Sequence, residues 1–290
     1  MAPLDFGIPA GSLQDATIEL FRRAGWHIVI ASRSYFPEVD DDDLRVTLMR
    51  AQEMSRYVEN GTFDAGITGK DWTLENQSDV EVIQALPYSR RSNRPTRAVL
   101  AVRKDSPIKT VQDLEGATIA AEMVNFTRCY LAERGITANV EFSWGATEAK
   151  VAGRLADAIV ETTETGSTLR AHGLREIETM LTSSPQVIAN KAAYADPVKK
   201  AKIDQVATML KAALDAQSRV ALKMNVPKDQ LDRIIALVPS VTAPTVADLY
   251  GQPWASVEIV VQERQVRELM PRLVKAGAEG IIEFPLNKFL

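Results

Sequence analysis

The sequence contains very little cysteine and histidine. Its 290 residues include one cysteine, Cys129, and two histidines, His27 and His172. A single cysteine excludes an internal disulfide framework, and a thiolate zinc site needs more ligands of these types than the chain offers. We therefore interpret Cys129 and His172 as structural residues.

Excess positive charge and long apolar runs are also missing. The formal net charge is -4 and the isoelectric point is about 5.5, so no basic surface is expected for nucleic acid or for an anionic membrane. The first residues, MAPLDFGIPAG, lack the basic and apolar regions of a signal peptide, and no later run approaches the ~20 apolar residues of a membrane span. We expect a cytoplasmic protein without nucleic-acid or membrane partners.

What the sequence does contain is an alternation of strand and helix patterns in two blocks of similar size. This order predicts an α/β fold with two lobes, largely parallel sheets and ligands at the carboxyl ends of the strands. In the first block the predicted strands are Leu4–Ile8, His27–Ala31, Leu44–Met49 and Phe63–Ile67. A turn at Gly11–Ser12 precedes the first predicted helix, Gln14–Ala24, and a second helix, Ala51–Glu59, precedes the last strand.

The last 80 or so residues show a different order. The longest predicted helix is Asp196–Arg219, and a strand at Val220–Asn225 and a helix at Pro227–Leu237 follow it. After a connector, PTVADLYGQP, comes a strand-helix-strand pattern that ends near Glu283. The order fits a ferredoxin-like unit of the βαββαβ type.

One segment has the properties of a phosphate-binding turn. In Asp157–Leu169, DAIVETTETGSTL, an apolar strand leads into a turn before a helical start at Leu169. Gly166 allows the backbone to approach an anion closely, and the hydroxyl groups of Thr165, Ser167 and Thr168 and the N–H groups of a helix N-terminus can donate to it. The alternative is that Ser167 and Thr168 only cap a helix.

Acidic residues flank the apolar part of the same strand. Glu161, and with it Asp157, would repel a phosphate, but carboxylates suit the 2- and 3-hydroxyls of a ribose or a magnesium ion beside it. A phosphorylated ribose satisfies both the turn and the acids.

The longer string ADAIVETTETGSTLRAHGLREIE resembles the phosphoribosyl-pyrophosphate (PRPP) loop of ATP phosphoribosyltransferase, the first enzyme of histidine biosynthesis. Further segments resemble the long form of that family in the same order: MRAQEMSRYVENG, FDAGITGKDW, GATEAKVAGRLAD, APTVADL and GAEGIIEFPL, together with SRSYFP. The resemblance covers essentially the whole chain.

The resemblance implies a two-lobed catalytic core of the periplasmic-binding-protein type and a ferredoxin-like regulatory domain. The expected parts are a first lobe at 1–95 with 183–209, a second lobe at 96–182 and a regulatory domain at 210–290. It also implies that N1 of ATP attacks PRPP, that Mg2+ accompanies the departing pyrophosphate, that L-histidine inhibits, and that the chain forms a homo-oligomer, a dimer or hexamer. Because N1 carries no proton, this chemistry needs positioning and charge neutralisation and no catalytic nucleophile of the protein.

The residues that would bind PRPP are those of the acid-flanked strand and turn. They are Asp157, Glu161, Thr162, Glu164, Thr165, Gly166, Ser167 and Thr168, with Mg2+ held mainly through the substrate and by Glu161.

Candidates for ATP or phosphate contacts are distributed over both lobes. Arginines suit bidentate phosphate contacts, a glycine after a strand allows close approach, and acids after strands suit ribose or magnesium. The candidates are Gly11, Arg33, Arg50, Gly69, Asp71, Glu122 and Glu148. The alternatives are solvated arginines, a helix cap at Asp71 and acids in the first turns of helices. The run Asp40–Asp43 is interpreted as a solvated loop, because adjacent acids cannot all face one ion.

The first turn departs from the family. Its members usually carry Lys and Arg there, in a string like P-K-G-R-L, whereas this chain reads Pro9-Ala10-Gly11-Ser12-Leu13. If those cations contact phosphates, each missing contact weakens binding by ~1.5–3 kcal/mol, unless other arginines replace it.

The resemblance places the histidine pocket between adjacent ferredoxin-like units, at Asn225, Thr245 and Gly280. Many relatives have an acid where Asn225 stands, and an acid would pair more strongly with the amino group of histidine. We therefore expect weaker inhibition. A non-catalytic small-molecule-binding or amino-acid-sensing paralogue with the same fold is the alternative to the enzyme, because a fold does not establish an activity.

Overall fold

A computed structural model describes residues 2–32, 34–89, 95–239 and 243–290. The chain forms two compact units. One consists of Met1–Arg22 and Trp26–Thr208, and the other of Arg23–Gly25 and Met209–Leu290. Within the described residues, no helix is both long enough and apolar enough to cross a membrane.

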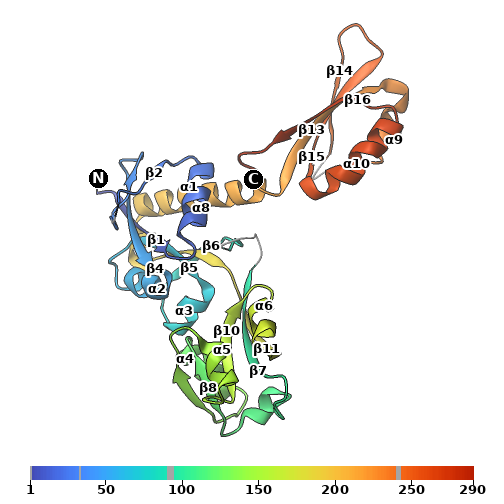
Figure 1. The fold of residues 1–290 in the computed structure, drawn as a ribbon. Helices are drawn as coiled ribbons and strands as arrows, with labels where there is room; N and C mark the ends of the chain where they lie inside the picture. Colours follow the sequence, from blue (N-terminus) through green and yellow to red (C-terminus); the bar gives the residue numbers. More distant parts are fainter. Residues whose placement is uncertain (1, 33, 90–94, 240–242) are drawn as a thin grey trace. The chain divides into compact units, whose positions relative to one another are not determined.

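The larger unit contains two five-stranded sheets, one in each lobe (Figure 1). The first-lobe sheet has the order β4-β1-β5-β12-β6. Its strands are β1 (Leu4–Ala10), β4 (Leu44–Arg50), β5 (Ala65–Gly69), β6 (Glu81–Ala85) and β12 (Pro185–Ala189). Strand β1 pairs in parallel with β4 and β5, and β12 runs antiparallel to β5 and β6.

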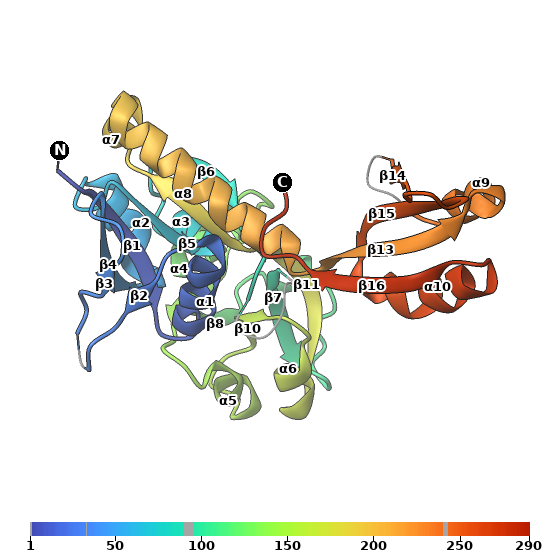
Figure 2. The same cartoon turned by 90° about the horizontal axis from the view of Figure 1, so that it is seen from above.

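The helices of the first lobe show why its sequence folds this way. In α1 (Gln14–Ala24) the buried residues Thr17, Leu20, Phe21 and Ala24 recur at helical spacing, so one face of the helix enters the core. The other helices of this lobe are α2 (Ala51–Glu59), α3 (Lys70–Glu75), α7 (Lys191–Ala195) and α8 (Pro197–Ala216). Helix α8 lies along the first lobe (Figure 2). Lys199 and Lys202 in its N-terminal half form ion pairs of 2.6 Å with Asp64 and Asp41.

The second-lobe sheet has the order β11-β7-β10-β8-β9. Its strands are β7 (Thr96–Arg103), β8 (Thr118–Ala121), β9 (Asn139–Phe142), β10 (Ala158–Thr163) and β11 (Leu174–Ser183). All residues of Ala98–Val102 are buried because helices cover both faces, and alternate side chains of β7 enter two different core clusters. The helices are η1 (Val111–Leu114), α4 (Val124–Ala132), α5 (Thr147–Ala152) and α6 (Ser167–Ala171).

The chain passes between the two sheets twice. The first passage connects β6 to β7, and the second connects β11 to β12 through Ser184. The boundary expected near 95 lies between strands of different sheets, and the one expected near 183 falls at the last residue of β11. Strands β11 and β12 themselves were not expected.

The acid run Asp40–Asp43 lies beside a short two-stranded sheet of β2 (Ile28–Val29) and β3 (Glu38–Val39). The prediction of a longer strand at His27–Ala31 was therefore wrong. Asp41 accepts hydrogen bonds from Trp26 Nε1 (2.7 Å) and Lys202 Nζ (2.6 Å). Burial acts to raise the pKa of Asp41, but these hydrogen bonds and the lysine charge outweigh it and lower the pKa. Asp41 thus stabilises the fold, and the run is not a uniformly solvated loop.

The smaller unit has the order βαββαβ. Its elements are β13 (Arg219–Pro227), η2 (Lys228–Gln230), α9 (Leu231–Ile235), β14 (Thr245–Asp248), β15 (Trp254–Gln262), α10 (Glu263–Lys275) and β16 (Glu279–Pro285). The sheet order β14-β15-β13-β16, with every pair antiparallel, is that of a ferredoxin-like fold. Helices α9 and α10 cover one face, where Leu222, Ile259 and Leu273 belong to one core cluster.

Two expectations for this region need correction. The expected helix Asp196–Arg219 ends at Ala216, because Arg219 already belongs to β13. The expected connector contains the strand β14, which pairs with β15 from Thr245 opposite Glu258 to Asp248 opposite Ala255. All four residues of β14 are exposed, so the sequence shows no alternation of buried and exposed positions there.

Candidate active site

The predicted phosphate turn follows β10, which lies between β7 and β8 in the second-lobe sheet. The strand ends at Thr163, and α6 begins at Ser167, two residues earlier than the sequence suggested. The Gly166 N–H donates to Thr163 Oγ1 (2.9 Å), and Arg170 Nη1 donates to the Thr165 carbonyl (2.9 Å). The exposed hydroxyl groups of Thr165 and Ser167 lie 3.1 Å apart. The turn is thus a compact loop with hydroxyl groups on its surface.

Gly166 is required by the shape of this loop. Its φ is +68°, a conformation that L side chains rarely adopt. A Cβ atom here would lie 2.3 Å from Glu176 Oε1, and Arg97 fixes Glu176 through contacts of 2.8 and 3.2 Å. Any side chain at position 166 would therefore displace the turn.

Beside the turn lies a cavity of about 200 Å3 that contains three acids. Glu122, Glu148 and Glu161 all line it, with Ala146 and Thr162 among the other lining residues. Burial, followed by the negative charge of Glu148 and then of Glu122, raises the pKa of Glu161 to about 7. Burial also raises the pKa of Glu122. We name this space the acidic cavity.

Carboxylate oxygens are suitable ligands for Mg2+, and a cation would relieve the repulsion among these three acids. However, no group of three or more His, Cys, Asp or Glu residues in the described parts of the chain is arranged to hold a metal ion. The donor set therefore fits Mg2+ that is coordinated mainly by substrate oxygens, with Glu161 as an added ligand.

Asp157 does not belong to this site. It lies at the opposite end of β10 from the turn, and its carboxylate accepts a hydrogen bond from the Thr118 N–H (2.9 Å). A six-residue strand spans about 20 Å, so the structure does not bring Asp157 together with the turn.

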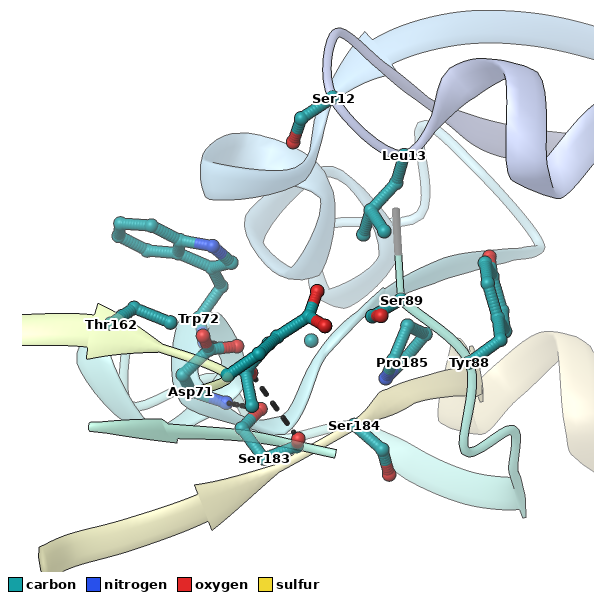
Figure 3. A pocket seen from close by; sticks show the side chains of 13 residues that line it. Ser12, Leu13, Asp71, Trp72, Tyr88, Ser89, Thr162, Ser183, Ser184 and Pro185 are labelled. Atoms are coloured by element: carbon teal, nitrogen blue, oxygen red, sulfur yellow. Dashed lines mark hydrogen bonds between the residues drawn. The ribbon is translucent and has the colours of Figure 1, made fainter. Parts of the chain in front are cut away.

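A second cavity, of about 230 Å3, lies where residues of both lobes meet (Figure 3). Ser12 and Leu13 come from the first turn, Gly69, Asp71 and Trp72 from the region where β5 meets α3, and Thr162 and Glu164 from the second lobe. Tyr88, Ser89, Thr96 and Ser183–Pro185 belong to the passages between the lobes. Its apolar walls, which include Trp72 and Tyr88, suit a planar ring. We name it the interlobe cavity.

Thr162 lines both cavities, so they adjoin at this residue. Two ligands bound side by side would meet near Thr162. Such an arrangement can join two substrates without a nucleophile of the protein, because it places their reacting atoms next to each other.

Comparison with known proteins identifies the family that has this architecture. A model of the family described as ATP phosphoribosyltransferase matches residues 50–212, and a model of the HisG C-terminal domain matches residues 216–288. The protein named ATP phosphoribosyltransferase from Desulfatibacillum aliphaticivorans is 60% identical over 287 residues, which are 99% of this chain and 98% of that protein. The chain belongs to the ATP phosphoribosyltransferase family. The Geobacter sulfurreducens protein named ATP phosphoribosyltransferase 1 is 56% identical over 99% of both chains.

Solved structures agree on the fold. A chain of the ATP phosphoribosyl transferase (HisG:HisZ) complex from Thermotoga maritima matches with a TM-score of 0.61 and 24% identity, over 71% of this chain and 95% of that one. The periplasmic aliphatic sulphonate binding protein SsuA from Escherichia coli matches with a TM-score of 0.50 and 18% identity, over 81% and 77%. The expected enzyme family, the periplasmic-binding-protein-like core and the ferredoxin-like C-terminal domain are confirmed.

The first turn of this ATP phosphoribosyltransferase has no cation of its own, but one reaches it from another strand. Ala10 lies opposite Arg50 in the parallel pairing of β1 and β4. A Cβ atom on Gly11, whose φ is +96°, would lie 3.3 Å from Arg50 Nη1, so this guanidinium lies against the turn. Arg50 is exposed and has no ion-pair partner among the described residues. Arg33, the other predicted arginine, lies outside the described residues.

The two lobes of the enzyme are also connected directly. Glu75, the last residue of α3, accepts hydrogen bonds from the N–H groups of Asn125 (3.1 Å) and Phe126 (2.9 Å) in the first turn of α4. Gln52 Nε2 lies 3.5 Å from Glu122 Oε1. Sequence reasoning missed Glu75 because nothing local marks an acid whose partners lie fifty residues away. It also missed Tyr88, Ser89, Thr96 and Ser183–Pro185, for the same reason.

In the C-terminal domain the three predicted histidine contacts lie on or beside the sheet face opposite the helices. Asn225 pairs with Ser256, and Thr245 pairs with Glu258, two residues further along β15. Gly280 has a φ of +58°, and a Cβ atom there would lie 3.5 Å from Asn225 Nδ2. Asn225 and Gly280 are therefore neighbours, and Thr245 is two strands away from Asn225.

Proposed function

We propose that the enzyme transfers the 5-phosphoribosyl group of PRPP to N1 of ATP, giving N1-(5-phosphoribosyl)-ATP and pyrophosphate. The observation that supports this most directly is that the acidic and interlobe cavities adjoin at Thr162. One is lined by acids beside a hydroxyl-rich turn, and the other combines the rings of Trp72 and Tyr88 with hydroxyl and carboxyl side chains. These properties match a phosphorylated ribose and a purine, respectively.

PRPP is assigned to the second lobe. Its 5-phosphate would be bound by the turn of Thr165–Thr168, where hydroxyl and backbone N–H groups are available, while Glu161 would contact the ribose hydroxyls. Thr162 and Glu164 would lie between the two substrates, because both line the interlobe cavity.

ATP is assigned to the first lobe and the interlobe cavity. The adenine ring would occupy the space beside Trp72. Arg50 would contact phosphate groups at the first turn, near Gly11. Arg33 remains a further candidate for phosphate contact. Gly69 lines the interlobe cavity at the end of β5, and Glu122 and Glu148 complete the acidic cavity.

In the reaction, the lone pair of N1 forms a bond with the anomeric carbon, and the bond from that carbon to pyrophosphate breaks with its electrons on the departing oxygen. The protein holds the two groups in line and excludes water, which accounts for a site without a nucleophile. Mg2+, when bound, neutralises charge on the pyrophosphate, and Glu161 would be its protein ligand.

The regulatory and cellular assignments are also proposals. We assign L-histidine as feedback inhibitor to the face bearing Asn225, Thr245 and Gly280, in a homo-oligomer of dimers or hexamers in the cytoplasm. The amide at Asn225 supports weaker inhibition than an acid would give. Tight inhibition in a histidine titration of activity would contradict this.

The test is to mix the purified protein with ATP, PRPP, Mg2+ and pyrophosphatase and to follow the ultraviolet absorbance of phosphoribosyl-ATP. We expect product that depends on both substrates. No product at high enzyme concentration would overturn the proposed function and would favour a non-catalytic binding protein of the same fold.

A further inference from the structure

A buried carboxyl group in the interlobe cavity, that of Asp71, is a predicted ATP or phosphate contact whose chemical role the proposed function leaves open. Asp71 is in the first turn of α3, immediately after β5, and only 7% of its surface is exposed. Asp71 Oδ1 accepts a hydrogen bond from the Trp72 N–H (3.1 Å), and the Ser183 hydroxyl lies 3.1 Å from the Asp71 N–H. Among the described residues Asp71 forms no ion pair with a lysine or arginine. A carboxyl group is thus held in a poorly solvated place without a paired cation.

The local backbone is adapted to this carboxylate. A Cβ atom on Gly69 would lie 2.0 Å from Asp71 Oδ1, so the glycine leaves the space that the side chain fills. Figure 3 shows Asp71 beside Trp72 and Ser183 in the wall of the interlobe cavity. A carboxylate that merely capped a helix would gain nothing from being enclosed, because burial without a cation disfavours its charge. Burial indeed raises the pKa of Asp71.

Asp71 is also close enough to the acidic cavity to interact electrostatically with one of its acids. Its charge contributes to the raised pKa of Glu122, after the burial of Glu122 itself, and Glu122 lines the acidic cavity. Asp71 and Thr162 line the same interlobe cavity, and Thr162 marks the junction. A purine whose N1 edge faces the ribose near Thr162 would then share the interlobe cavity with the Asp71 carboxyl group.

The proposed reaction creates a positive charge at that edge. When N1 forms the bond to the anomeric carbon, the ring loses no atom, so the adenine becomes a cation whose charge is shared by N1, C6 and the 6-amino group. The 6-amino group then becomes a stronger hydrogen-bond donor. Protein groups accelerate the chemical step when they stabilise a charge that develops only in the transition state. They are most effective in a site with little water.

We infer that Asp71 is a catalytic residue whose carboxylate accepts a hydrogen bond from the 6-amino group of ATP and stabilises the positive charge that develops on the adenine. This inference rests on the proposed function and extends it. It assigns the selection of a 6-aminopurine over a 6-oxopurine to the same residue, because a 6-oxo group would place one acceptor against another.

The test uses two methylated nucleotides that mimic the reacted base. 1-methyl-ATP carries a positive charge and a 6-amino donor, whereas 1-methyl-ITP is nearly the same size but neutral and has a 6-oxo acceptor. Dissociation constants are measured by titration calorimetry with Mg2+ for the wild type, Asp71→Asn and Ser183→Ala. The serine variant is the control, because it removes one hydrogen-bond partner of Asp71 and retains the carboxyl group.

We expect the wild type to bind 1-methyl-ATP about 10- to 100-fold more tightly than 1-methyl-ITP. Asp71→Asn should abolish most of that preference and lower kcat with ATP by about 100-fold, and Ser183→Ala should keep the preference. Equal binding of the two nucleotides by the wild type would overturn the inference even if Asp71→Asn failed to fold. A preference that survives in Asp71→Asn would also overturn it.

These outcomes are separable from a failure of the proposed function. If the wild type forms no phosphoribosyl-ATP from ATP and PRPP, the proposed function is wrong whatever the binding preference. If product forms and the preference is absent, the function stands and the role of Asp71 is refuted.

Discussion

The turn after β10 in the second lobe and the turn after β1 in the first lobe are both assigned to phosphate groups, yet they are built differently. In the second lobe, the groups assigned to phosphate come from one continuous stretch, Thr165–Thr168, around Gly166. In the first lobe, the turn at Pro9–Leu13 offers only Gly11, Ser12 and Leu13, and its cation comes from Arg50, forty residues later. The second-lobe site is thus a local sequence motif, whereas the first-lobe site forms only when β1 pairs with β4.

The largest expected effect comes from breaking the continuous turn. Gly166→Val forces a β-branched residue to a positive φ and against Glu176, so the turn must move. We expect the PRPP concentration for half-saturation to rise about 100-fold or more, measured by initial rates at saturating ATP. Gly173→Val is the control, because Gly173 also has a positive φ of +71° but no neighbour within 4 Å of an added Cβ atom. Unchanged PRPP kinetics in Gly166→Val would reduce the turn to a helix cap.

Removing the distant cation should have the next largest effect. Arg50→Ala eliminates the guanidinium beside Gly11, and loss of one charge-assisted contact corresponds to roughly a 10- to 100-fold weaker interaction. We expect kcat/KM for ATP to fall by this amount while the thermal stability is retained, because Arg50 is exposed.

Arg45→Ala is the matched control for that experiment. Arg45 lies on the same strand, β4, but its guanidinium pairs with Asp5 at the other end of the sheet. We expect ATP kinetics close to the wild type. If both variants lost activity equally, the strand as a whole would be responsible and the first-lobe assignment would be wrong.

These two turns also show what the sequence can predict. The second-lobe turn, with Glu161, was identified because strand, glycine and hydroxyl groups follow one another, and the alternation of strands and helices indicated the fold class. Strands β11 and β14 were missed because each has a largely exposed or irregular burial pattern. Arg50, Glu75 and Tyr88 acquire their surroundings only through long-range pairing, which a local pattern cannot reveal.

A smaller effect is expected from pH. The pKa of Glu161 is raised to about 7 from 4.5, so the protonated form predominates below pH 7 and the carboxylate above it. If the carboxylate binds the ribose hydroxyls, the KM for PRPP should fall by up to about 10-fold as the pH rises from 6 to 8. Glu161→Gln should remove this pH dependence and leave only that of the substrate phosphates, and an identical pH profile for both enzymes would exclude the role.

Ionisation of Glu161 should have opposite effects on PRPP binding, which it favours, and on the stability of the folded chain, which it lowers. Because the pKa of Glu161 is higher in the folded than in the unfolded chain, folding favours its protonated form. The free energy of unfolding of the ligand-free wild type should therefore decrease relative to Glu161→Gln as the pH rises from about 4.5 to 7. Denaturant unfolding at several pH values measures this directly. It separates the destabilisation that ionised Glu161 causes in the folded chain from the contribution of Glu161 to PRPP binding.

The smallest effect is expected from restoring the missing lysine. Ala10 lies opposite Arg50 in the β1–β4 pairing, so Ala10→Lys would place a second cation beside one already present. The new charge attracts phosphate but also repels the guanidinium of Arg50, and both groups are near water, where such interactions are weak. We expect kcat/KM for ATP to change by less than about 3-fold, with Ala10→Gln as the uncharged control. In the Arg50→Ala background the same lysine should recover a larger part of the lost activity, because it then acts alone. Equal effects in the two backgrounds would mean that the lysine and Arg50 serve different phosphates, and that the first turn is not supplied by the neighbouring strand.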